Sequence, residues 1–314
     1  MQRIDVHQHL LSEALIEQLA RRRRPPMLIR RGGGWTFRVS GEPDSVLSFD
    51  ATNVALRAVE IRRDDVDRAL VALSTVLGIE TLPGEEAVPL LEAHHRGVEE
   101  LPAGFGGWGA VQLEAPDPAE VDAVRGRGCV GVSLPATALA HPDGLAHVGP
   151  LLAALESHGA PLFVHPGPVA PEAGPVRPVP VWWPALTDYV AQMQAAWFAF
   201  LHGGRREHPR LRVLFAMLAG GAPLQLERFV ARGGTDPLAP DPLVYYDTSS
   251  YGPRMLEAMA NAVGFTQLVY GSDRPVVDPF PPQLGPQLGR LLHSTNPHSL
   301  LTPRQKGDLA WPQG

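Results

Sequence analysis

Short runs of apolar residues recur along the chain at intervals typical of a repeating strand–helix unit. The runs are rich in Val, Leu and Phe, and most are continuous rather than alternating with polar residues, which indicates strands buried on both faces, as in parallel sheets. Eight runs are predicted as strands: Ile4–His9, Ala69–Ser74, Gly107–Gln112, Gly131–Leu134, Pro161–His165, Arg212–Ala216, Leu243–Asp247 and Gln267–Gly271.

Helix-like stretches separate these runs. Five are predicted as helices: Glu13–Arg22, Ala119–Arg125, Leu145–His158, Leu186–His202 and Pro253–Val263. Eight buried strands with helices between them fit a closed (β/α)8 barrel better than an open sheet. The predicted fold class is therefore α/β, a single distorted (β/α)8 TIM barrel over residues 1–314, a length at which such barrels occur as one domain.

Two stretches interrupt the alternation. Residues 29–49 carry three consecutive glycines and then alternating apolar residues from Trp35 on, which predicts a small hairpin inserted after the first strand. Residues 166–184 are rich in proline and contain the pair Trp182 and Trp183. Because the loops that follow barrel strands lie at the active-site end, both stretches are predicted to form lids.

Composition narrows the class of protein. A hydrophobic content of 44% and a mean hydropathy of -0.06 describe a soluble globular chain, and a net charge of -6 argues against a nucleic-acid partner. No apolar run reaches the roughly 18 residues that a membrane span needs. The sequence opens directly into a strand, and the single cysteine, Cys129, suits a reducing compartment. We therefore expect a cytoplasmic protein without a membrane partner.

The basic residues are almost all arginine. Lys306 is the only lysine among 27 Lys and Arg residues, so Schiff-base chemistry and a lysine-bridged metal pair are not expected in the barrel. Arg21–Arg24, followed by Arg30 and Arg31, form the one concentrated basic stretch. Two interpretations remain open for it: a solvated helix end, or a pocket for an anionic substrate.

Four residues at predicted strand ends carry metal-binding side chains. His7 and His9 are two positions apart in a predicted strand, so their side chains point to the same face. His165 and Asp273 each lie at the end of a buried strand; a proline follows His165 directly and Asp273 after one further residue. Each has a structural alternative: a packed core histidine, or a helix-capping aspartate. Because the carboxyl ends of barrel strands meet at one rim, the four side chains together predict a metal site.

The chemistry of this set favours a divalent transition metal. Three imidazoles and a carboxylate suit Zn²⁺ first and also Mn²⁺ or Fe²⁺, with one ion expected and two not excluded. Such an ion can lower the pKa of a bound water or polarise a carbonyl. Asp273 is a candidate proton shuttle for that water, and Arg274 beside it is a candidate bidentate anchor for a substrate carboxylate or phosphate.

The chain resembles the amidohydrolase superfamily, in the branch typified by aminocarboxymuconate-semialdehyde decarboxylase. The matching stretches are IDVHQH at 4–9, PLFVHPG at 161–167, HPRLRVLFA and AGGAP within 208–223, and YGSDRP at 270–275. The resemblance implies a distorted barrel with a metal on His7, His9, His165 and Asp273. It leaves the reaction open, since the branch contains decarboxylases, hydratases and hydrolases.

One departure from the family pattern bears on the reaction. Members usually have a histidine at the end of the sixth strand, regarded in the decarboxylases as the acid–base partner beside the metal. Here the stretch 215–221 reads FAMLAGG. This weakens a decarboxylase assignment. His202 is the nearest replacement imidazole in the sequence, either as an additional metal or acid–base group or as a helix-terminal histidine that binds the last carbonyls.

Five aromatic residues are candidates for the wall of an apolar or aromatic substrate site, although ordinary packing explains each of them singly: Trp35, Trp182, Trp183, Tyr189 and Tyr246. The leading prediction is a metal-dependent hydrolase of an ester, thioester, lactone or amide of an organic acid. The alternatives are a non-oxidative decarboxylase or other lyase, and a degraded subunit that partners an active paralogue. The expected partners are a small anionic substrate and a second subunit, identical or paralogous.

Overall fold

Eight parallel strands form a ring in the part of the chain that the computed structural model describes, which is residues 1–48, 52–170, 178–235, 240–280 and 284–302. In chain order they are β1 (Ile4–His9), β5 (Arg68–Ala72), β6 (Phe105–Gly107), β7 (Val132–Pro135), β8 (Leu162–His165), β9 (Val213–Phe215), β10 (Val244–Asp247) and β11 (Leu268–Val269).

An isolated bridge at each of two joints closes the ring. The strands pair in the orders β1-β5-β6 and β11-β10-β9-β8-β7. A parallel bridge from Gly109 to Val132 joins the two groups on one side. On the other side a bridge from Gln8 to Arg274 joins them, and the Val6 N–H donates to the Tyr270 carbonyl at 2.9 Å. The predicted distorted (β/α)8 barrel is therefore confirmed, and its distortion lies at these two joints.

The continuous apolar runs of the sequence form strands that are buried on both faces. Val6, Leu70, Leu134, Val164 and Leu214 are completely buried, because the barrel interior covers one face of each strand and the helices cover the other. Burying one such side chain stabilises the fold by about 1.5–3 kcal/mol. These buried side chains stabilise the ring of strands, so the residues at its rim can be polar.

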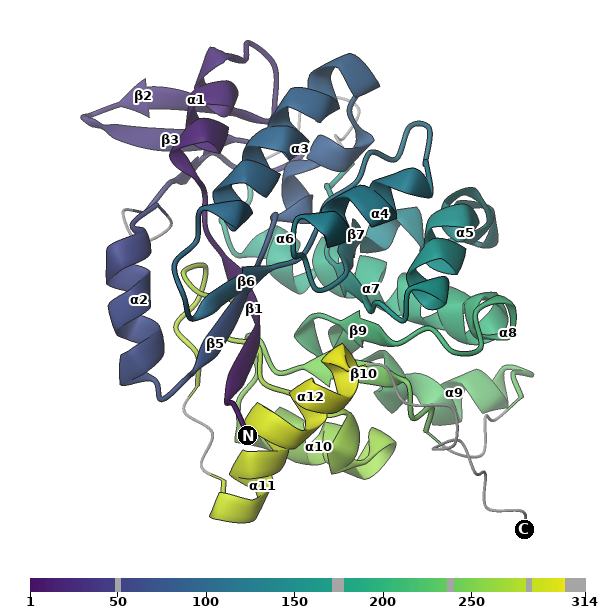
Figure 1. Ribbon diagram of the computed structural model, residues 1–314. Coiled ribbons are helices and arrows are strands. Elements are labelled where there is room, and N and C mark those ends of the chain that lie inside the picture. The colour runs from purple at the N-terminus through teal and green to yellow at the C-terminus, as the bar shows by residue number, and fades with distance from the viewer. Residues whose placement is uncertain (49–51, 171–177, 236–239, 281–283, 303–314) are drawn as a thin grey trace.

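Helices surround the strands (Figure 1). They are α1 (Glu13–Arg21), α2 (Val54–Arg63), α3 (Gly84–Glu99), α4 (Ala119–Gly126), α5 (Pro142–Ser157), α6 (Trp183–Leu186), α7 (Asp188–Ala199), α8 (Arg205–Glu207), α9 (Leu226–Ala231), α10 (Pro253–Val263), α11 (Pro286–Arg290) and α12 (Asn296–Leu301). Short 3-10 and π-helical turns complete the chain: η1 (Thr75–Leu77), η2 (Ile79–Thr81), η3 (Ala136–Ala138), η4 (Phe200–Gly204), η5 (Met217–Gln225), η6 (Phe265–Gln267) and η7 (Leu291–Thr295).

Some predicted boundaries differ from the structure. The third strand lies at Phe105–Gly107 rather than at 107–112, and α3 and α4 pack against Gly107 and Gly109 too closely for a side chain at either position. A Cβ on Gly107 would lie 2.4 Å from Val98 of α3. Helices α2 and α3 are not among the predicted helices, and Pro89 inside α3 interrupts its pattern.

The predicted inserted hairpin is present and carries a third strand. An antiparallel sheet is formed by β2 (Met27–Arg31), β3 (Gly34–Arg38) and β4 (Ser45–Val46), after α1 rather than directly after β1. Gly32 and Gly33 make the turn with φ of 56° and 84°, values that favour glycine. Figure 1 shows this sheet beside α1, at the end of the molecule toward which β1 runs.

Among the described residues, none of the helices combines the length and the apolar character required to cross a lipid bilayer.

Candidate metal centre

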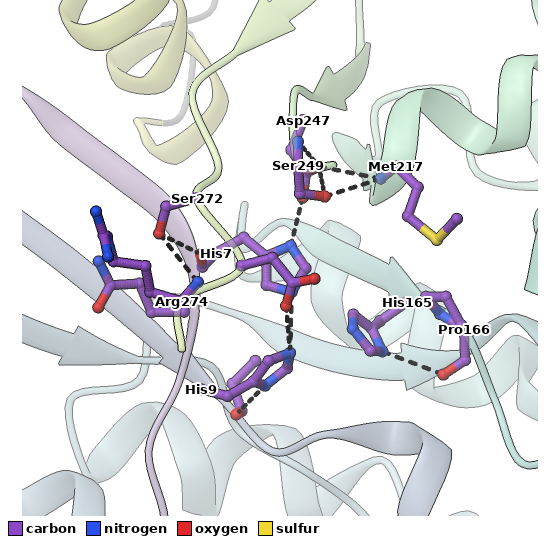
Figure 2. Close-up of polar contacts among 12 residues, drawn as sticks. His7, His9, His165, Pro166, Met217, Asp247, Ser249, Ser272 and Arg274 are labelled. Carbon is purple, nitrogen blue, oxygen red and sulfur yellow. Dashed lines mark hydrogen bonds and ion pairs between the residues drawn. The ribbon is translucent and has the colours of Figure 1, made fainter. Parts of the chain in front are cut away.

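His7, His9, His165 and Asp273 converge at one rim of the barrel. His7 and His9 lie on β1, His165 ends β8, and Asp273 follows β11. One ligand-type atom from each of the four residues lies within 4.8 Å of the others. The Nε2 atoms of His7 and His9 are 3.1 Å apart, and Asp273 Oδ1 lies 3.5 and 3.2 Å from them. Figure 2 shows the three imidazoles facing a common centre.

Hydrogen bonds at Nδ1 fix the tautomers of the two β1 histidines. His7 Nδ1 donates to Asp247 Oδ2 at 2.7 Å, and His9 Nδ1 donates to the Ala72 carbonyl at 3.0 Å. A backbone carbonyl and an ionised Asp247 carboxylate can only accept hydrogen bonds, so the ring nitrogen must be the donor in both cases. Each ring therefore carries its proton on Nδ1 and presents the lone pair of Nε2 to the centre.

His165 is held in the same tautomer by Thr75. The Thr75 hydroxyl donates to the Pro166 carbonyl at 2.6 Å, so its oxygen accepts from His165 Nδ1 at 2.9 Å. His165 Nδ1 also lies 3.1 Å from the Pro166 carbonyl. Its Nε2 is left for the centre. Sequence reasoning did not find Thr75; its position just after the predicted strand 69–74, at the catalytic rim, is the one signal that could have found it.

These residues fit a divalent cation. With its proton on Nδ1, each of these two rings would point an Nε2 lone pair at the other across 3.1 Å, so a positive charge is needed between them, either a second proton on His7 or a metal ion. Asp273 Oδ1 is buried and has no hydrogen-bond partner among the described residues, so it too points a lone pair at the same place. A metal ion would satisfy all of these groups at once, and the borderline-to-hard donor set suits Zn²⁺, Mn²⁺ or Fe²⁺.

The electrostatics of the cluster favour positive charge. Burial by itself lowers the pKa of His7, but the charges of Asp247 and Asp273 outweigh it and raise that pKa to about 9. Burial, together with His7 and His9, places the pKa of His165 well below its usual value. The buried carboxylates of Asp247 and Asp273 therefore favour a positive charge in the cluster, and the neutral His165 can act as a metal ligand.

Asp247 orients His7 by a hydrogen bond on the side of the ring that faces away from the other cluster residues. Its carboxylate is fully buried, and Oδ1 accepts from the backbone N–H of Ser249 at 3.0 Å, from the Ser249 hydroxyl at 2.5 Å and from the N–H of Met217 at 3.0 Å. Oδ2 is left for His7. The structure shows that Asp247 anchors the loop at Ser249 and also fixes the tautomer of His7.

Asp273 itself is held in an unusual backbone conformation. Its φ is 57°, in the left-handed region that residues other than glycine rarely adopt, and its N–H donates to the His7 carbonyl at 2.8 Å. Such a conformation costs on the order of 1–3 kcal/mol and persists where the surroundings fix it, often at functional sites. Here it turns the carboxylate from the end of β11 toward the histidines of β1.

Arg274 points away from the cluster (Figure 2). Its guanidinium pairs with Asp64 at 3.0 Å and with Asp278 at 3.1 Å. These carboxylates neutralise the cation that the sequence suggested as an anchor for an anionic substrate. Within the arginine-rich stretch, Arg22 forms an ion pair with Glu86 at 2.9 Å, and Arg31 forms one with Asp44 at 3.3 Å.

The remaining predicted site residues are not ligands of the cluster. His202 is exposed in the π-helical turn after α7. Tyr246 is buried, and its hydroxyl accepts from Trp197 Nε1 at 2.9 Å. Trp35 is half-buried in β3, beneath Arg30. Among the described residues the four-residue cluster is the only group of three or more His, Cys, Asp or Glu side chains that could hold an ion.

The two tryptophans of the predicted lid are exposed in the single chain. Trp182 and Trp183 expose 56% and 44% of their surface, and their rings lie 5.7 Å apart. Part of that segment, 171–177, lies outside the described residues, so the lid role remains a prediction. Tyr189, at the start of α7, donates a hydrogen bond from its hydroxyl to Glu42 Oε1 at 2.6 Å.

Met217 stands in the stretch where the resemblance implies a histidine. It is half-buried against the core, and the five residues 217–221 all have a positive φ. No imidazole approaches the cluster from this stretch.

Known structures share this fold, although no protein-family model matches the chain and no curated protein matches its sequence. IDCase from Metarhizium anisopliae, in apo form, superposes with a TM-score of 0.75 at 17% identity over 96% of this chain and 97% of that one. A 5-carboxyvanillate decarboxylase from Novosphingobium aromaticivorans, complexed with manganese and 4-hydroxy-3-methoxy-5-nitrobenzoic acid, has a TM-score of 0.71 at 14% identity over 96% of both chains. An amidohydrolase II has a TM-score of 0.71 at 18% identity over 95% and 99%. The chain has the barrel fold of these proteins over nearly its whole length.

Proposed function

We propose that this chain is a metal-dependent hydrolase of the amidohydrolase superfamily that acts on an ester, thioester, lactone or amide of an organic acid. The observation that carries the proposal is the cluster of His7, His9, His165 and Asp273, in which each imidazole is held at Nδ1 and offers Nε2. The fold that this chain shares with a manganese-containing decarboxylase and with an amidohydrolase II supports the proposal.

The four residues of the cluster would hold one divalent ion, with Zn²⁺ first and Mn²⁺ or Fe²⁺ as alternatives. A bound ion of this kind lowers the pKa of water and polarises a carbonyl group. Asp273 keeps 13% of its side chain exposed, so its carboxylate can take a proton from a water that enters the site. Asp247 holds the His7 ring in place during this transfer.

A decarboxylase or other lyase is the second candidate. Fold similarity to 5-carboxyvanillate and 2,6-dihydroxybenzoate decarboxylases favours it. Two features of this chain favour hydrolysis instead. Met217 lies in the stretch where the decarboxylases of the resembled branch carry their acid–base histidine, and Arg274 is paired with Asp64 and Asp278 rather than free to bind a carboxylate.

Metal analysis followed by two assays tests the proposal. Protein purified without added metal is expected to contain about one ion per chain and, with Zn²⁺ or Mn²⁺, to hydrolyse members of a panel of carboxylic esters, thioesters, lactones and amides. Release of CO2 from hydroxybenzoates without any hydrolysis would support the lyase instead. A metal-free protein that is inactive in both assays would support a degraded subunit. His141→Ala, an exposed histidine outside the cluster, is the control.

A further inference from the structure

A pocket lies on the outside of the barrel, at the joint between β11 and β1 and apart from the metal centre. It has a volume of about 560 Å³, and its lining includes Arg3 before β1, Tyr270 after β11 and His293 of η7. The Tyr270 N–H donates to the Leu292 carbonyl at 3.1 Å, which holds η7 against the outer side of β11. None of the four cluster residues lines this pocket. Its volume is in the range of small-molecule sites, roughly 300–1,000 Å³.

Two buried polar side chains of the lining have atoms without a partner. His293 is only 5% exposed and forms no hydrogen bond within the described part of the chain; its ring lies 4.3 Å from that of Tyr270. Arg274 is 9% exposed, and its Nε has no partner among the described residues. Buried polar groups without a partner are rare in folded proteins. A ligand in the pocket would give the His293 imidazole the hydrogen bond that the protein does not supply.

His293 is a neutral imidazole in this position. Burial lowers its pKa to about 4, and the charge of Arg3 adds to the effect. At neutral pH one ring nitrogen therefore carries a proton and the other a lone pair. The ring can donate a hydrogen bond to an oxygen of a ligand without bringing a charge of its own into the pocket.

The charges of the lining leave one arginine for an anion. Asp64 is the only carboxylate among the described residues that line the pocket, and it pairs with Arg274 at 3.0 Å. Arg3 Nε lies 3.2 Å from a carboxylate oxygen of Asp65. Arg290 lies exposed on α11 and forms no ion pair with a described residue. A ligand with a single negative charge would therefore match the described part of the lining.

The rest of the lining is mainly apolar. Phe280 exposes 58% of its surface, and Leu284 is half-buried in the same pocket. Together with the ring of Tyr270 and two prolines, Pro279 and Pro286, they form a surface that a flat apolar group can cover. Covering this surface removes it from water, which favours binding.

We propose that this pocket is a second binding site, for a small organic acid with one negative charge and an apolar or aromatic body. The acid group pairs with Arg290 and accepts a hydrogen bond from His293, while the body of the ligand covers Phe280 and Leu284. The site depends neither on the metal nor on the proposed hydrolase function, because no cluster residue contributes to it.

Isothermal titration calorimetry with 2-naphthoate tests the site. The wild type is expected to bind it in this pocket with an affinity that does not change when a chelator removes any metal. Arg290→Ala is expected to weaken binding about three- to fivefold, as for a single solvated ion pair. His293→Phe keeps an aromatic ring against Tyr270 but removes the donor, and is expected to weaken binding about tenfold or more. The neutral 2-naphthamide should bind more weakly than 2-naphthoate.

Gly289→Phe blocks the pocket without removing any of these groups. Gly289 lines the pocket on α11, and a Cβ there meets no atom within 4 Å, so the new ring extends into open space. Binding is expected to be lost. The matched controls are Gly149→Phe, at a glycine of α5 with equally open surroundings, and Arg228→Ala, at an exposed arginine of α9. Both should bind like the wild type.

Binding that survives Gly289→Phe, or that disappears with the metal, would place the ligand outside this pocket and overturn the proposal. Absence of binding to the wild type at millimolar concentrations would overturn it as well. If His293→Phe does not fold, Gly289→Phe and Arg290→Ala decide the question from surface positions of α11. Failure of this site leaves the proposed hydrolase function untouched, since the two are measured in separate assays.

Discussion

At the scale of single residues, hydrogen bonds from neighbouring residues orient the side chains of the candidate metal cluster. Asp247 contributes no ligand, yet it selects the tautomer of His7 and receives three hydrogen bonds that keep its carboxylate in place. Thr75 does the same for His165. Because an imidazole binds a metal only through an unprotonated nitrogen, these partners make the histidines ligands rather than merely polar side chains.

Replacing His7 by alanine is expected to abolish metal retention and activity while leaving a folded barrel. The variant removes one Nε2 donor and leaves Asp247 without its partner, whereas the hydrophobic core is unchanged. Metal content by elemental analysis and the far-ultraviolet circular dichroism spectrum measure the two effects. A variant that retains a full equivalent of metal would show that the ligand set is wrong. In a metal-bound structure, the four donor atoms should lie about 2.0–2.3 Å from the ion.

We expect the buried Glu80 to make the free energy of unfolding depend on pH. Its side chain is fully buried, and neither of its carboxylate oxygens has a hydrogen-bond partner in the described part of the chain. Burial raises its pKa from 4.5 to about 8. Between these values the folded protein binds more protons than the unfolded chain, so this group lowers stability as pH rises through that window. Glu80→Gln is expected to remove the effect and to stabilise the protein at pH 7 by at most about 3 kcal/mol.

Urea unfolding at pH 5.5 and pH 8 measures this prediction. The difference in unfolding free energy between Glu80→Gln and the wild type should grow from the lower to the higher pH. Glu85→Gln, at an exposed position on α3, is the control. A difference of the same size at both pH values would mean that Glu80 is not held protonated by burial.

At the scale of elements, strand ends and the segments that follow them position the site. β1, β8 and β11 deliver their ligands to one rim because parallel strands in a barrel end on the same side. After β9 the chain turns through five residues, 217–221, with positive φ, which places the Met217 N–H on Asp247. Gly220 has φ of 60°, and a Cβ there would lie 2.8 Å from the Val190 carbonyl oxygen, so only glycine fits this turn without a shift.

Trp183→Ala tests the predicted lid formed by 166–184. The segment starts at His165, and its first residues are held to α7 by Gln192. Two exposed tryptophans are costly to leave in water, so they cover either the substrate site or a second subunit. We expect the variant to change substrate affinity or turnover without a change in oligomeric mass. Val59→Ala, which changes an exposed apolar residue on α2, is the control.

Light scattering and steady-state kinetics separate the two roles of this segment. Dissociation of an oligomer in Trp183→Ala, with unchanged kinetic constants per folded subunit, would identify the segment as an interface and end the lid hypothesis.

At the scale of the whole molecule, the barrel core stabilises the fold, and the proposed metal would add to that stability. The main cluster of buried apolar residues runs through the strands and helices from Ile4 to Leu300. A chelator that removes the ion is therefore expected to abolish activity and lower Tm, since a bound ion stabilises only the folded state, but to leave the circular dichroism spectrum folded. Loss of that spectrum on metal removal would make the metal structural.

The local pattern of apolar and polar residues was sufficient to predict the strands and the direction of the side chains along them. Continuous apolar runs indicated eight buried strands, and the strand period of two put His7 and His9 on one face. Strand ends marked by His165 and Asp273 then predicted the ligand cluster, because barrel topology brings such ends to one rim. The third strand was misplaced, since packing of helices against Gly107 and Gly109 is not a property of that segment alone.

Only the tertiary structure decided which polar groups meet. His7 and Asp247 are separated by 240 positions, and Glu42 and Tyr189 by 147, so no periodicity links them. Arg274 follows Asp273 of the candidate metal cluster in sequence, but successive residues point in different directions, and its guanidinium pairs with Asp64 of another segment. The sequence by itself determined where ligand-type side chains leave the strands. Folding determined their tautomers and their hydrogen-bond partners, because these follow from contacts between distant segments.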